Sequence, residues 1–429
     1  MRALLKLRFA LVCGSLLVLA GAWSAAAQTT TPPPDPSDPF FDDSVVQEIR
    51  LEINTKDWTT LKTNFLLNDY YPCAMKWGAI TVTNIGIRSR GTGSRSGVKP
   101  GLRVDFDRYM ANQKFLGLKS FVLRNQTQDP SNLHERVAMM FFKRQGVLAS
   151  REAHVRLYVN NEYDGLYTIV ESIDKTWLQK NLGEDGGTLY KYDYNVDDRP
   201  YYFESRGSDP AAYVPSPFKP ETNESDPQPA SLVDMIRVIN DAPAALFKQQ
   251  IAQFLDMGQF IKHIAIEIFL ADSDGFNGNW GMNNFYLYRY NNQNLYKFIP
   301  WDKSEAFKDG PTYPIFHNIY DVPEAIRNRL TMRVLNDPQL RTQFLDTLAE
   351  CARSAAEPVI DTPETTPPAT RGWLEREVER EYAQIRDAAL ADTTKTYTNE
   401  EFEAAVEAMR VFARERSAFV TSQVAQARP

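Results

Sequence analysis

The chain has 429 residues, of which 43% are hydrophobic and 12% aromatic, and its formal net charge is −7. This length and composition predict two domains or lobes with a large core. The acidic balance and the lack of any basic run exclude nucleic acid as an expected partner.

The first 27 residues have the pattern of a secretory signal peptide. Three basic residues precede an apolar stretch, which ends in small residues at Ala25–Ala27. We therefore expect cleavage near Ala27 and export to the periplasm, the cell surface or the medium. Removing three positive charges takes the formal charge from −7 to about −10. No later segment is apolar enough to predict a transmembrane helix.

The composition after the signal peptide predicts a linker. It does not decide whether the two remaining cysteines form a disulfide. Residues 28–40 are rich in Pro, Thr and Asp, which indicates an extended and mobile segment. Cys73 and Cys351 remain after cleavage. Export permits a disulfide between them, but two free thiols are as compatible with the sequence.

Alternating strands with one inserted helix are expected in the first half of the chain. The helix covers residues 131–146, with Ser131 as its cap and Gly146 as its stop. An earlier helix is expected from Thr55. The expected strands lie within 44–54, 79–91, 102–109, 120–125 and, as a pair around an Asn-rich turn, 154–174.

Helices are expected to dominate the second half, which also contains an irregular Pro/Ser-rich insertion at 203–230. The expected helices lie within 173–182, 230–242, 256–272, 336–355, 371–392 and 398–425. The sequence thus predicts an α+β fold with two lobes, as in protein kinases. The β-rich N-lobe would span 41–171, and the helical C-lobe would span 172–429 with an active-site hairpin at 269–307.

The segment 269–307 places acids and amides on a glycine-rich loop before a hairpin, with strands near 284–290 and 295–299. Asn279 follows Asp274 by five positions, and Asp302 follows the hairpin. Phosphoryl transfer needs an acid that orients the acceptor hydroxyl and oxygen ligands for Mg²⁺. We interpret Asp274 as that acid, and Asn279 and Asp302 as the metal ligands. The alternative is that these residues only form turns, and Asp272 is interpreted as a loop cap.

Two further segments carry candidate binding residues. A glycine loop within 86–105 contains Arg90, Lys99 and Arg103, and such a loop can bind phosphate groups or be an ordinary hairpin turn. Glu135 lies in the first turn of the expected helix. Its negative charge either stabilises the helix through the helix dipole or pairs with a phosphate-binding lysine.

Other chemistries lack support in the sequence. The ligand positions of a calcium loop around Gly275 would fall on Leu270 and Gly281, which excludes an EF-hand. The four histidines are scattered, so a zinc site is not expected. No nucleophile elbow is present, and no carboxylate pair stands out for a glycosidase.

Taken together, the motifs resemble the CotH kinase family of spore-coat-protein-H-like proteins. They are "IGIRSRGTGSRSGVKPGLRVDF", "DPSNLHERVAMMFFKRQGV", "VRLYVNNEYDGLYTIVESID", "GTLYKYD", "FLADSDGFNGNWGMNNFYLY" and "FIPWDKSEAF", and they span roughly 45–307. The resemblance implies a divergent protein-kinase-like fold and ATP-dependent phosphorylation of secreted or coat proteins with a divalent metal.

The resemblance also implies roles for single residues. Asp274 would be the catalytic acid, and Asn279 and Asp302 would bind the metal. Of Lys99 and Arg103, one would contact phosphate. The remaining assignments place Glu135 in the inserted helix and Glu171 at the nucleotide hinge.

Two functional hypotheses follow. The first is an exported kinase that uses ATP with Mg²⁺ or Mn²⁺ to phosphorylate Ser or Thr of secreted or surface proteins. Lys99, with Arg103 or Arg90, would bind the phosphates, and Glu135 would position the lysine. The alternative is a non-catalytic, pseudokinase-like surface protein with a binding or structural role, because ATP is scarce outside the cytoplasm.

Overall fold

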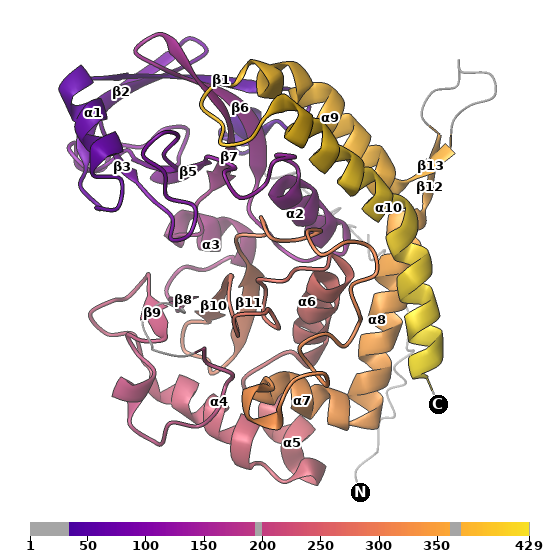
Figure 1. Ribbon diagram of the computed structural model, residues 1–429. Helices are drawn as coiled ribbons and strands as arrows, with labels where there is room; N and C mark the ends of the chain where they lie inside the picture. Colours follow the sequence, from indigo (N-terminus) through magenta and orange to yellow (C-terminus); the bar gives the residue numbers. More distant parts are fainter. Residues whose placement is uncertain (1–33, 194–199, 361–369, 429) are drawn as a thin grey trace, which may run out of the picture. The chain divides into compact units, whose positions relative to one another are not determined.

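A closed barrel of β-strands begins the folded part of the computed structural model, in the segment drawn from indigo to violet in Figure 1. The structure describes residues 34–193, 200–360 and 370–428. Pro36–Pro429 form one unit, distinct from Met1–Asp35, and the architecture below belongs to the larger unit. The expected signal peptide, residues 1–27, lies outside the described residues.

The barrel has the strand order β1-β2-β3-β4-β5-β7-β6 and is closed by a parallel pairing of β6 with β1. The other neighbouring strands are antiparallel. Alternation fills the interior: Ile49, Leu51 and Ile53 of β1 are buried, whereas Glu48 and Glu52 are exposed. The strands are β1 (Gln47–Ile53), β2 (Tyr71–Trp77), β3 (Ile80–Ser89), β4 (Leu102–Asp105), β5 (Ser120–Arg124), β6 (Glu152–Val159) and β7 (Glu162–Glu171).

Two helices belong to this part of the chain, and both are capped differently from the prediction. In α1 (Thr55–Thr63) the Asn54 side chain, not Thr55, accepts the first free amide. The helix α2 (His134–Arg144) begins three residues after Ser131, whose hydroxyl donates to Asp129 instead. Asp129 also accepts the amide of His134 at 2.8 Å, so it closes the turn that starts the helix.

The prediction of an extended linker over residues 28–40 is wrong for its last residues. Asp38–Phe41 form a short 3₁₀ helix, and both Phe40 and Phe41 are buried in the barrel core. Phe40 makes edge-to-face contacts with Phe115 and Phe121. Two aromatic side chains are too costly to leave in water, so the chain is fixed to the barrel before β1 begins.

A second sheet lies beyond the barrel in the chain and has the order β11-β10-β8-β9. It contains the predicted hairpin, because β10 (Phe285–Arg289) pairs with β11 (Tyr296–Pro300) in antiparallel register. The strand β8 (Thr188–Tyr192) pairs with β10 on its other side. The insertion expected to be irregular supplies β9 (Phe218–Pro220), which pairs with β8.

Helices form most of the remaining chain, as predicted, so the fold is α+β. In Figure 1 the paired helices α9 and α10 run beside α8, and α9 also reaches the barrel strand β7. The helices are α3 (Lys175–Leu182), α4 (Ala230–Asp241), α5 (Ala244–Ile251), α6 (Met257–Phe269), α7 (Arg329–Asn336), α8 (Pro338–Ala356), α9 (Trp373–Ala391) and α10 (Asn399–Ala427). A small hairpin, β12 (Pro358–Ile360) with β13 (Thr370–Gly372), precedes α9.

The described residues answer the question that the sequence left open about the cysteines. Cys73 and Cys351 are both free and buried, the first in the barrel core and the second in the helical core. None of the helices in the described ranges has the length and apolar character needed to cross a membrane.

Candidate active site

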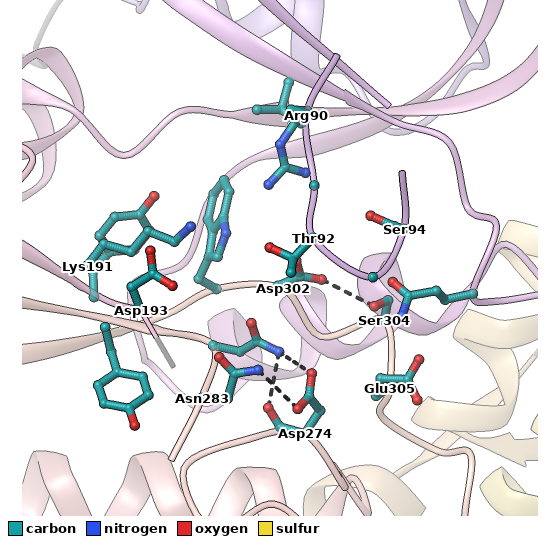
Figure 2. A pocket seen from close by; sticks show the side chains of 18 of the residues that line it. Arg90, Thr92, Ser94, Lys191, Asp193, Asp274, Asn283, Asp302, Ser304 and Glu305 are labelled. Carbon is teal, nitrogen blue, oxygen red and sulfur yellow. Dashed lines mark hydrogen bonds between the residues drawn. The ribbon is translucent and has the colours of Figure 1, made fainter. Parts of the chain in front are cut away.

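A cavity of about 660 Å³ lies between the loop that follows β3 and the segments on either side of the β10–β11 hairpin. This volume is in the range of small-molecule binding sites. Figure 2 shows Arg90 and Asp274 at opposite ends of the cavity, with Asp302 between them. The charged residues that line it are Arg88, Arg90, Arg95, Arg103, Asp174, Lys191, Asp193, Lys219, Glu221, Asp274, Asp302, Glu305 and Lys308.

Asp274 is held by two neighbouring amides. Its Oδ1 accepts a hydrogen bond from Asn283 Nδ2 at 3.0 Å, and its Oδ2 accepts one from Asn284 Nδ2 at 2.8 Å. Burial raises the pKa of Asp274 to about 7, and the nearby carboxylates of Asp272 and Asp302 act in the same direction. The carboxylate is therefore oriented and basic enough to accept a proton near neutral pH.

Asp302 follows the β10–β11 hairpin, which forms where the sequence predicted it. It follows Trp301, whose amide donates to the Asn284 carbonyl and so brings the end of β11 beside the start of β10. Asp302 Oδ2 lies 2.7 Å from Arg124 Nη1, and Ser304 Oγ donates to Oδ1 at 3.2 Å. Burial would raise the pKa of Asp302, but the cations of Arg124 and Arg90 lower it to about 2. Asp302 is thus a permanently ionised group.

Arg124, at the end of β5, is a site residue that the sequence did not reveal. Its Nε lies 2.5 Å from Glu135 Oε2 of α2, and its guanidinium lies over the Trp301 ring at 5.2 Å. Burial would lower the pKa of Arg124, but Asp302 and Glu135 raise it. Glu135 therefore pairs with an arginine that reaches Asp302, not with a lysine. Only the folded chain brings these residues together, so no motif could have shown the pair.

Lys303 connects the two loops that carry Asp274 and Asp302. Its buried ammonium lies 2.5 Å from Glu267 Oε1 and 2.9 Å from Asp272 Oδ2. Glu267 also accepts the amide of Phe276, and Asp272 accepts the amide of Asp274. Asp272 thus caps the loop, as interpreted from the sequence, but it also belongs to a buried ion network.

Gly275 is required where this network meets the loop. A Cβ atom at this position would lie 2.7 Å from Asp272 Oδ2 and 2.8 Å from Glu267 Oε2. Any side chain would therefore push the two carboxylates away from Lys303. The glycine is explained by this close approach and not by a turn alone.

Asn279, the other predicted metal ligand, is not among the residues that line the cavity. It is exposed and lies in the turn Gly278–Gly281. Its Oδ1 accepts a hydrogen bond from Asn318 Nδ2 at 2.7 Å and lies 3.0 Å from His317 Nε2. The five-residue offset from Asp274 thus points to a loop anchor. The amides that reach the cavity belong to Asn283 and Asn284, after the turn.

The structure separates the other predicted binding residues into two groups. Arg90 and Arg103 line the cavity, as expected for phosphate-binding side chains. Lys99 does not, because its buried ammonium bonds Asp392 Oδ2 at 2.6 Å and the Leu166 carbonyl at 2.8 Å. The Glu171 carboxylate also does not, because it pairs with Arg151 at 2.6 Å. The Lys99 ammonium and the Glu171 carboxylate are thus both engaged in ion pairs outside the cavity lining.

The comparisons with known proteins agree with the motifs. The sequence model of the family described as CotH kinase protein matches residues 87–420. The chain belongs to the CotH kinase family. Inner spore coat protein H of Bacillus subtilis (strain 168) is 25% identical over 378 residues, which cover 86% of this chain and 95% of that protein. The resemblance inferred from sequence is thus confirmed, and this CotH family member is a kinase-like protein.

The solved structures that match include the following two. The Helicobacter pylori proinflammatory kinase CtkA has a TM-score of 0.28 and 10% identity, with coverage of 80% of this chain and 95% of that chain. HipA from the Shewanella oneidensis MR-1 toxin–antitoxin complex with HipB and operator DNA has a TM-score of 0.31 and 12% identity, with coverage of 76% and 60%.

The placement of Lys99 gives a first prediction. Lys99→Met leaves the buried Asp392 carboxylate without its cation, so we expect a loss of about 3–5 kcal/mol in the free energy of unfolding. Urea denaturation measures this loss, and adding Asp392→Asn should recover part of it. Affinity for ATP with Mg²⁺ should remain within about two-fold, since no phosphate contact is removed. Lost nucleotide affinity at unchanged stability would instead return Lys99 to the phosphate site.

The raised pKa of Asp274 gives a second prediction, for protein free of metal and nucleotide. The folded state keeps this proton up to about pH 7, whereas the unfolded chain releases it near the usual 3.8. The stabilisation is therefore complete below pH 3.8 and is lost as the pH rises through 7. Between pH 5 and pH 8 the wild type should lose more stability than Asp274→Asn in urea denaturation. Equal losses would show that Asp274 does not titrate in this range.

Proposed function

We propose that the chain is an exported, ATP-dependent phosphotransferase that acts on Ser or Thr side chains of secreted or surface proteins. The observation that carries the proposal is one cavity in which Asp274 and Asp302 face the cations Arg90 and Arg103. Phosphoryl transfer requires a carboxylate that can accept the proton of the acceptor hydroxyl. It also requires an ionised carboxylate for the metal and cations for the phosphate groups of the donor.

The fold supports a two-lobed arrangement around this cavity. The barrel, within 41–171, would be the N-lobe, and residues 172–429 would be the C-lobe. Residues from both parts line the cavity: Arg90 and Arg103 come from the barrel, and Asp274 and Asp302 from the later chain. The Arg124–Glu135 pair would take the place of the lysine–glutamate pair of protein kinases. This arrangement would make Arg124, and not Lys99, the residue that Glu135 positions.

The donor set fits a divalent metal that is shared with phosphate oxygens. Mg²⁺ is bound by few protein carboxylates together with water and phosphate. Asp302 offers an ionised carboxylate on the cavity wall. The described ranges contain no group of three or more His, Cys, Asp or Glu side chains that could hold a metal ion. Asp302 would therefore hold Mg²⁺ or Mn²⁺ with phosphate groups, and the metal would supply charge neutralisation.

Each cavity residue then has a defined task. Asp274 accepts the proton of the acceptor hydroxyl, whose oxygen bonds the terminal phosphorus as the bond to the bridging oxygen breaks. Asn283 and Asn284 keep the Asp274 carboxylate oriented. Arg90 and Arg103 offset the negative charge of the phosphates. Arg124 keeps Asp302 in place from the barrel side.

Transfer of labelled phosphate tests the proposal. With γ-labelled ATP and Mg²⁺ or Mn²⁺, we expect label on the protein itself or on an extract of exported proteins. Asp274→Asn should reduce the rate by about 10²–10⁴-fold, as for a lost general base. Asp302→Asn should reduce it at least as far.

Glu305→Gln is the matched control, because Glu305 lines the cavity but pairs with Lys308. Its rate should stay near that of the wild type. Transfer that survives in Asp274→Asn, or falls equally in Glu305→Gln, would contradict the assignment. ATP binding without any transfer would point to the non-catalytic alternative.

A further inference from the structure

Arg90 and Lys191 are two cations that line the same cavity without an anionic partner. Neither side chain has an ion pair or a hydrogen bond to any residue that the structure describes. Other cations of the cavity are engaged: Arg103 lies 3.5 Å from Asp105, Lys219 lies 2.9 Å from Glu221, and Lys308 lies 2.6 Å from Glu305. Arg88 and Arg95 also line the cavity and bond neutral acceptors, among them Asn68 Oδ1. Among the cations that line the cavity, only the side chains of Arg90 and Lys191 therefore lack both a hydrogen bond and an ion pair to the described residues.

Two charged side chains close together at a partly buried site are unfavourable for the folded protein when no anion is bound. Both side chains are half-buried, and burial lowers the pKa of each. Repulsion by Arg90 lowers the pKa of Lys191 further. Glu221 and Asp193 attract Lys191, and Asp302 attracts both cations, but none of these carboxylates forms an ion pair with either of them. Asp302 is already engaged by Arg124 and Ser304. Two like charges at a shared, partly dehydrated site favour the entry of an anion.

The loop after β3 adds neutral donors beside these cations. Among the described residues, the backbone amides of Thr92, Gly93 and Ser94 donate to no protein acceptor. The loop is nevertheless held in place, because Asn125 Nδ2 donates to the Ser94 carbonyl at 2.8 Å. Figure 2 shows Thr92 and Ser94 on the segment that continues from Arg90 into the cavity. Unpaired amides in a fixed loop can bind an anion.

We propose that Arg90 and Lys191, with the amides of residues 92–94, form a subsite for a phosphoryl group. A phosphate monoester carries a charge of about −1.5 to −2, which matches two cations, whereas a carboxylate would neutralise only one. The guanidinium of Arg90 can bind two phosphate oxygens side by side, and Lys191 contributes a point charge. Lys191 reaches the cavity from β8, the strand that pairs with β10 in the second sheet.

The subsite deepens the proposed function, on which its assignment to the transferable phosphoryl group rests. Asp302, the proposed metal ligand, lies in the same cavity. A terminal phosphoryl group held by Arg90 and Lys191 would thus be near Asp302 as well. Anion binding by the pair does not itself depend on catalysis, so it can be tested separately.

The first test measures binding of inorganic triphosphate, without metal, to the full folded chain by titration calorimetry. Lys191→Met and Arg90→Met should each weaken binding by about ten-fold or more, the size of one charge-assisted hydrogen bond. Lys219→Met is the matched control, because Lys219 lines the cavity but is paired, and it should change binding by less than about two-fold. Inorganic phosphate in parallel shows whether a single phosphoryl group is sufficient.

The second test is the thermal stability of the same variants without any anion. Removing one of two repelling cations should raise the Tm in Lys191→Met and Arg90→Met, whereas triphosphate should stabilise these variants less than the wild type. Triphosphate affinity equal to the wild type in Lys191→Met, or a lowered Tm that marks Lys191 as a structural cation, would overturn the subsite. If the wild type binds triphosphate as predicted but transfers no phosphate, the proposed function alone would be overturned.

Discussion

The buried ammonium of Lys303 is the interaction on which the geometry of the site depends. It lies between Glu267 and Asp272, and the outer oxygens of these carboxylates hold the amides of Phe276 and Asp274. A buried carboxylate pair is unfavourable without a cation, so the network is stable only when all three side chains meet. Since Lys303 directly follows Asp302, this requirement fixes the Asp274 loop and the Asp302 turn relative to each other.

A second ionic connection joins that unit to the barrel. Arg124 lies between Glu135 on α2 and Asp302 on the later chain. The consequence is that the position of α2 is coupled to the carboxylate proposed to hold the metal. In protein kinases a helix controls activity through a glutamate that pairs with the phosphate-binding lysine. In this chain, any movement of α2 would act through an arginine, whose two-sided guanidinium can contact both carboxylates at once.

The sequence predicted the features that depend on local pattern. Alternation and periodicity predicted most strands and helices, and the predicted hairpin before Asp302 forms between β10 and β11. It could not predict contacts between distant segments: Lys99 pairs with Asp392, 293 positions later, and the parallel β1–β6 pairing closes the barrel. The prediction of Asn279 as a ligand rested on its spacing from Asp274 and on the family resemblance, and the turn Gly278–Gly281 places it outside the cavity lining. Arg124 could not be predicted as a site residue either, because its contacts with Glu135 and Asp302 join distant segments of the chain.

Asp302 is the residue that we propose to hold a divalent metal together with ATP. The most direct test is titration calorimetry of ATP with Mg²⁺ and with a chelator, for the wild type and for Asp302→Asn. We expect Mg²⁺ to strengthen ATP binding to the wild type, and we expect Asp302→Asn to lose about ten-fold or more of that affinity while it remains folded. Mg²⁺-dependent binding that is equal in both proteins would contradict this proposal.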